Sequence, residues 1–90
     1  MRRFVIDGVT IPMDIFLDEG LTPLDKIIAG LIIYHTDEVY SALENREIAE
    51  LCGCSERTVS TSVSHLVKRG YFTVAKFDGR TRILKYNINV

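Results

Sequence analysis

The sequence predicts a single α+β domain, residues 1–90, in which a three-helix core lies between two β-hairpins. Apolar residues recur at intervals of three and four between positions 22 and 70, in stretches separated by cap residues and glycines. Both ends of the chain hold β-branched and aromatic runs around an Asp-Gly pair. A chain of 90 residues, 47% of them apolar, is long enough for one modest core.

The N-terminal segment, residues 1–21, is expected to form a hairpin and a short helix. Residues 4–6 and 9–11 flank Asp7-Gly8, which is a strong two-residue hairpin signal. The proline that follows ends the second run, because proline cannot donate to a strand ladder. A short helical turn is expected at residues 13–17.

The first core helix is expected at residues 23–35. Thr22 can cap this helix, Pro23 suits its first position, and Asp25 can reach back toward the cap. The residues that repeat on its buried face are Leu24, Ile27, Ile28, Leu31 and Ile32.

Two more helices follow in the core. Asn45 can cap a helix at residues 46–52, and Ser55 can cap a helix at residues 56–69. Gly70 is expected to end the last helix, as glycine does just past a helix terminus.

The last twenty residues, 71–90, are expected to form the second hairpin. Residues 71–77 are rich in aromatic and β-branched side chains, and Asp78-Gly79 is a turn signal. On the return strand, apolar residues alternate with others and are expected to share one side: Leu84, Tyr86, Ile88 and Val90.

The two helices around Gly53 have the arrangement of a helix-turn-helix. Ala49 is small where the helices must cross closely, and Gly53 suits the backbone of the turn. The second helix of such a pair enters the major groove of DNA. The apolar residues expected to fix the crossing are Ile48, Leu51, Val59 and Val63.

Two stretches resemble known families. The run REIAELCGCSERTVSTSVSHLVKRGYF resembles the winged helix-turn-helix family of bacterial and phage DNA-binding proteins. The run TIPMDIFLDEGLTPLDKIIAGLII is similar to the opening of phage replication-initiator and DnaD-like primosome domains. Asp25-Lys26 stands where those domains usually have Glu-Lys, and Cys52 and Cys54 stand where aliphatic residues are commoner.

Helix geometry selects the side chains of residues 56–69 that would touch DNA. Arg57 is the best candidate for reading bases, because a guanidinium can bond two acceptors of guanine. The small hydroxyl side chains suit phosphates or base edges. The alternative is a Ser/Thr-rich face that is merely solvated. The candidate residues from this part of the chain are Ser55, Arg57, Thr58, Ser60, Thr61, Ser64 and Lys68.

The second hairpin, or wing, is the other candidate DNA site. Arg80 and Arg82 follow its turn, and Lys76 lies across the hairpin. Two arginines on a β-ribbon suit phosphates or a minor groove. The alternative is that these charges protect a strand edge from aggregation.

Charge is divided between the two halves of the chain. The total is −1, but residues 1–45 carry −5 and residues 46–90 carry +4. Such a split favours one face for an anionic partner.

No catalytic constellation, cofactor or metal site is expected. His35 and His65 have no carboxylate or cysteine partner at a ligand spacing, and Cys52 and Cys54 are read as free thiols in a reducing cytosol. The sequence lacks a signal peptide and an apolar run long enough to span a membrane, so a cytoplasmic protein is expected.

Together the residues and the resemblance imply double-stranded DNA binding, with phage or plasmid replication initiation as the favoured role. A transcriptional repressor and a winged-helix adaptor that binds proteins instead of DNA remain alternatives. The near-neutral total charge favours the adaptor, because phosphates dominate DNA affinity. Expected partners are duplex DNA, a second copy of the chain bound through the N-terminal hairpin and first helix, and replication proteins. Separate faces for Arg57, Lys68, Arg80 and Arg82 would favour the adaptor.

Overall fold

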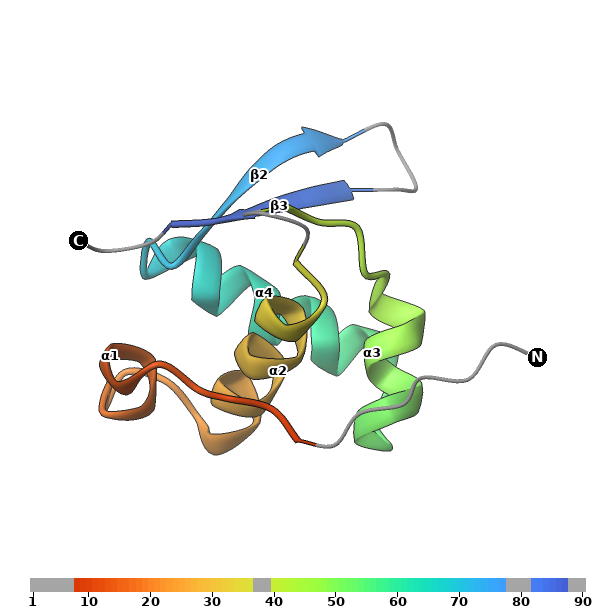
Figure 1. The fold of residues 1–90 in the computed structure, drawn as a ribbon. Helices are drawn as coiled ribbons and strands as arrows, with labels where there is room; N and C mark the ends of the chain where they lie inside the picture. Colours follow the sequence, from red (N-terminus) through yellow and green to blue (C-terminus); the bar gives the residue numbers. More distant parts are fainter. Residues whose placement is uncertain (1–7, 37–39, 78–81, 88–90) are drawn as a thin grey trace.

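The computed structural model describes residues 8–36, 40–77 and 82–87, and it has the predicted α+β class. The helices pack together as one layer, and a small antiparallel sheet of order β1-β3-β2 covers one side of them (Figure 1). The elements are α1 (Met13–Phe16), α2 (Pro23–Tyr34), β1 (Tyr40–Ser41), α3 (Asn45–Cys52), α4 (Glu56–Lys68), β2 (Phe72–Phe77) and β3 (Arg82–Tyr86).

The start of α2 follows the predicted capping pattern. The backbone N–H of Asp25 donates to Thr22 Oγ1 at 3.1 Å, and the N–H of Thr22 donates to Asp25 Oδ2 at 3.0 Å. Two backbone donors that the helix itself cannot pair are thereby satisfied. The helix ends one residue earlier than predicted, with His35 as its C-terminal cap.

The start of α3 corrects the prediction for Asn45. Asn45 is the first helical residue, and Glu44 is the cap. The N–H of Glu44 donates to Glu47 Oε1 at 3.0 Å, which closes the first turn one residue before the expected position.

The ends of α4 agree with the cap residues read from the sequence. Ser55 Oγ accepts from the N–H of Thr58 at 3.1 Å, so Ser55 caps the helix as predicted. Arg69 caps the other end, and Gly70 follows with a φ of +88°, a conformation that disfavours any residue with a Cβ atom.

The expected strand at residues 9–11 is wrong. These residues belong to no strand, and its expected partner, residues 4–6, lies outside the described part of the chain. Side-chain carbons of Val9 and Ile11 lie 3.4 and 3.1 Å from the point where a Cβ on Gly30 would stand. The segment therefore packs across α2 at Gly30, which has no side chain, and its apolar residues contact the helix instead of a partner strand.

The sheet has a strand that the sequence analysis did not predict. Tyr40 and Ser41 form β1, which pairs antiparallel with β3 through Lys85 and Leu84. Two residues are too few to give an alternation pattern, so nothing in the sequence distinguishes β1 from a loop.

The wing hairpin, β2–β3, agrees with the prediction where it is described. Leu84 is fully buried and Tyr86 is half-buried on the side facing the helices. The turn and residues 88–90 lie outside the described part. The hairpin contains a bulge, because Val74 pairs with Leu84 and Lys76 with Ile83, which leaves one extra residue on β2.

One hydrophobic core joins the helices to the sheet. Every element except β1 contributes a side chain, and the loop residues Leu21 and Leu43 close its edges. Its fully buried large side chains are Ile15, Ile28, Ile32, Ile48, Val59, Leu66, Phe72 and Leu84.

A buried carboxylate connects α2 to α4. Asp25 is 1% exposed, its Oδ2 lies 3.0 Å from His65 Nδ1, and it also accepts from the Ser62 hydroxyl. Burial raises the pKa of Asp25, but the hydrogen bonds from Ser62, Thr22 and His65 outweigh it and leave this pKa below its ordinary value. His65 has no carboxylate partner at a ligand spacing in the sequence, but the fold supplies one forty residues away.

A second polar cluster holds the loop before α2 against the end of α4. Arg69 donates to both oxygens of Asp18, at 2.9 and 2.7 Å, and the Tyr71 hydroxyl donates to Asp18 Oδ2 at 2.7 Å. The hydrogen bond from Tyr71 is the main cause that lowers the pKa of Asp18, and it raises the pKa of Tyr71 to about 12.

Asp25→Asn should lower the free energy of unfolding at pH 7 by about 1–3 kcal/mol, because charge-assisted hydrogen bonds inside the protein are lost. Urea denaturation measures this loss, and the melting temperature should fall by roughly 4–8 °C for each kcal/mol.

The same pair of proteins tests the pH dependence. The folded-state pKa of Asp25 lies below its ordinary value of 3.8, so its contribution is present above that value and is lost as pH falls through the lowered pKa. The stability difference between wild type and Asp25→Asn should therefore narrow in acid. Equal stability of the two proteins at pH 7 would contradict this assignment.

Candidate nucleic-acid interface

The helix-turn-helix unit is formed by α3, a short turn and α4. Gly53 has a φ of +68°, as the turn requires, and the N–H of Cys54 donates to the carbonyl of Ala49 at 3.1 Å. Ile48 and Val59 are fully buried where the two helices meet.

Leu51 does not fix the crossing, contrary to the prediction. Its side chain is 40% exposed, while Cys52 and Cys54 are half-buried against the core. A helix of two turns gives too short a repeat to tell which of two adjacent apolar residues faces inward. Burial is the main cause that raises the pKa of the Cys52 thiol, so this cysteine behaves as a small apolar residue.

The exposed face of α4 carries a stripe of predicted contact residues. Arg57, Thr61, Ser64 and Lys68 are all exposed, and their spacing of four, three and four residues aligns them along one side of the helix. Ser60 is exposed beside this stripe. We call these five residues the α4 stripe.

Two predicted contact residues are already used by the helix start. The hydroxyls of Ser55 and Thr58 lie 2.9 Å apart, and Thr58 is half-buried. Ser55 remains exposed at the first turn. Sequence spacing alone did not reveal this pairing.

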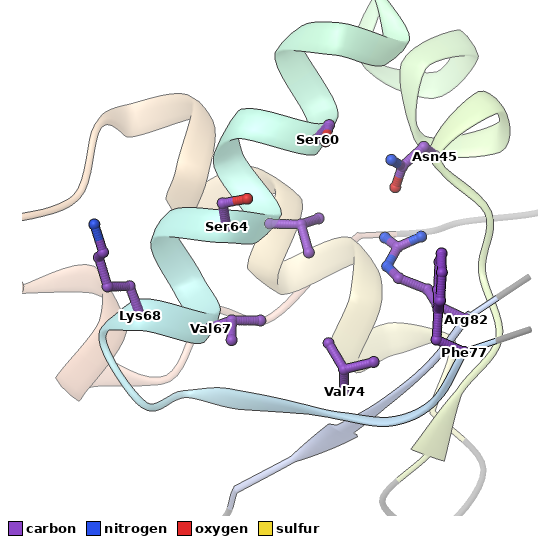
Figure 2. Close-up of a pocket in the computed structure, with 9 residues that line it drawn as sticks. Asn45, Ser60, Ser64, Val67, Lys68, Val74, Phe77 and Arg82 are labelled. Carbon is purple, nitrogen blue, oxygen red and sulfur yellow. The ribbon is translucent and has the colours of Figure 1, made fainter. Parts of the chain in front are cut away.

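A groove of about 750 Å³ separates α4 from the wing hairpin (Figure 2). Its floor and walls are apolar, and polar side chains border it. The lining residues are Asn45, Ser60, Val63, Ser64, Val67, Lys68, Val74, Phe77 and Arg82.

Arg82 points into this groove toward Asn45 (Figure 2). Its Nε and Nη2 atoms are buried without a hydrogen-bond partner among the described residues, and so is Asn45 Oδ1. Burial lowers the pKa of the Arg82 guanidinium. The other predicted wing arginine, Arg80, lies outside the described residues.

The bulge in β2 decides which wing residues face α4. Phe77 pairs with Arg82, and both line the groove, whereas Lys76 pairs with Ile83 and does not. Successive residues of a strand point to opposite faces, so Lys76 is exposed on the far side of the hairpin. Lys68 and Arg82 thus share a face, and Lys76 lies on another.

A metal site and a membrane-spanning helix each require features that the described residues lack. No group of three or more His, Cys, Asp or Glu side chains there could hold a metal ion. None of the described helices is long and apolar enough to cross a membrane.

The chain matches known proteins at two levels. The family model described as "Helix-turn-helix domain" matches residues 19–71. A solved structure described as the N-terminal domain of a DNA-binding protein aligns with a TM-score of 0.65 and 18% sequence identity, over 100% of this chain and 86% of that one. This structural likeness supports the winged helix-turn-helix fold. A search of curated proteins gave no match.

The matched region extends from the loop before α2 to the residue that precedes β2, and it contains the whole α3–turn–α4 unit. The chain therefore belongs to the helix-turn-helix domain family.

Proposed function

We propose that this domain binds double-stranded DNA, with α4 in the major groove and the wing hairpin against the neighbouring backbone. The observation that carries this proposal is the α4 stripe, which presents two cationic and three hydroxyl side chains on the second helix of the motif. Such side chains bond base edges and phosphates. The similar structure is described as part of a DNA-binding protein, which supports the same function.

The net charge of −1 argues against DNA binding, but two of the acidic residues are paired inside the protein. Asp25 of α2 is buried against α4, and Asp18 is paired with Arg69. Neither carboxylate is free to repel a phosphate backbone. Lys68 and Arg82 line one groove, and Arg57 continues the line of Lys68 along α4. This grouping favours DNA binding over the adaptor function.

The finer role that we propose is replication initiation in a phage or plasmid, with a transcriptional repressor as the alternative. Its support is the resemblance of residues 10–33 to replication-initiator domains. Binding of the purified domain to a replication origin, compared with promoter fragments of the same replicon, would separate the two roles.

Dimerisation through the N-terminal segment and α2 would increase affinity by presenting two recognition helices. Apolar side chains that are exposed on α1 and α2 support this proposal: Met13, Phe16 and Ile27 are 63%, 51% and 45% exposed. Sedimentation of the domain with and without duplex DNA would reveal the dimer.

Arg57→Ala should weaken binding to the preferred duplex by about 1–3 kcal/mol, because a two-bond contact to guanine is lost. The preferred duplex is first selected from a randomised pool. The fold should remain intact, since Arg57 is exposed. Arg57→Lys is the matched control: it keeps the charge but should lose most of the sequence preference. Unchanged affinity of Arg57→Ala would remove Arg57 from base reading.

Arg80→Ala combined with Arg82→Ala should weaken binding to selected and random duplexes alike. Each lost phosphate contact should flatten the plot of log affinity against log salt by about one unit, so the double change should flatten it by roughly two. Lys85→Ala is the control, because Lys85 is exposed on the far face of the hairpin. An unaltered slope with increased aggregation would show instead that the arginines protect a strand edge.

A further inference from the structure

The groove between α4 and the wing hairpin exposes apolar surface that the fold leaves uncovered. Phe77 and Val74 are 66% and 44% exposed, and both line it. Val63 and Val67 of α4 form the opposite wall. The bulge in β2 places the Phe77 ring, and not the Lys76 ammonium, against this space.

The two ends of the groove are positively charged. Lys68 borders one end and Arg82 the other, with the valines between them (Figure 2). The described residues that line the groove include no Asp or Glu. The buried Nε and Nη2 of Arg82 have no hydrogen-bond partner among the described residues, which is unusual for buried donors.

We propose that this groove binds a segment of single-stranded DNA, with phosphates at Lys68 and Arg82 and an unstacked base on Phe77. Because Lys68 and Arg82 border opposite ends of the groove, a chain with repeated phosphates can contact both. The exposed ring and the valines match the face of a base, which a duplex hides within its stack. A volume of about 750 Å³ is within the range that accommodates ligands larger than a single anion.

This inference goes beyond the proposed binding of duplex DNA and does not depend on it. The α4 stripe and the groove share Ser60, Ser64 and Lys68. Arg57 is not among the residues that line the groove, and Phe77 is not part of the stripe. Arg57 and Phe77 therefore report on different sites. Loss of duplex binding in Arg57→Ala with intact single-strand binding would separate the two activities.

The test compares three fluorescently labelled probes by anisotropy at one salt concentration: a short oligo(dT) strand, an abasic strand of the same length, and a duplex of the same length. Phe77→Leu keeps the apolar volume but removes the ring. It should weaken oligo(dT) binding by about fivefold or more, because stacking on an aromatic ring is lost. Binding of the duplex and the abasic strand should not change. Phe77→Trp should retain oligo(dT) binding.

Tyr40→Leu is the matched control, because Tyr40 is an exposed aromatic residue that pairs with Lys85 on the far face of the sheet. It should leave all three affinities unchanged. The proposal is overturned if wild type binds the abasic strand as tightly as oligo(dT), or if Phe77→Leu changes duplex and single-strand binding equally. Circular dichroism checks that each variant is folded. Because the Phe77 side chain is exposed, its replacement should not disturb the fold.

Discussion

The position of α4 depends on one buried carboxylate. Asp25 caps the start of its own helix through Thr22, and the same carboxylate bonds Ser62 and His65 on α4. A buried charge is tolerated only when nearly all of its hydrogen-bonding capacity is used, so the two helices are held at one rotation relative to each other. Because Ser62 and His65 face α2, the α4 stripe must face outward.

Ordinary packing alone would hold α4 less specifically. Val59, Val63 and Leu66 make apolar contacts without direction, so their burial specifies the rotation of α4 less narrowly than a hydrogen bond does. The pair formed by Asp18 and Arg69 adds a second directional contact at the far end of the helix. Two polar contacts, one near its middle and one at its end, therefore fix α4 both along its axis and around it.

Local chemistry made much of the fold predictable. Caps depend on residues three or four positions apart, so Thr22, Ser55 and Gly70 marked helix ends correctly. The predictions failed where the structure of a segment depends on contacts with residues far away in sequence. Residues 9–11 had strand-like composition, but they pack on Gly30. His65 seemed unpartnered because its partner is in another helix.

The candidate site was predictable to a similar degree. Helical spacing placed the α4 stripe on one face, and the exposures agree. The sequence could not predict that the Arg82 side chain points into the groove. Its direction depends on the register between β2 and β3 and on the space beside α4. The groove itself has no sequence signal, because its walls come from two elements that meet only after folding.

The bulge in β2 determines which side chains of the wing face α4. With the extra residue between Val74 and Lys76, Phe77 faces α4. If β2 instead paired regularly, with Ala75 opposite Ile83 and Lys76 opposite Arg82, every later residue would change sides. The aromatic wall would then become a cationic one with no change of sequence. A one-residue slip in the pairing of β2 and β3 would thus replace an aromatic side chain with a second cation beside the same valines.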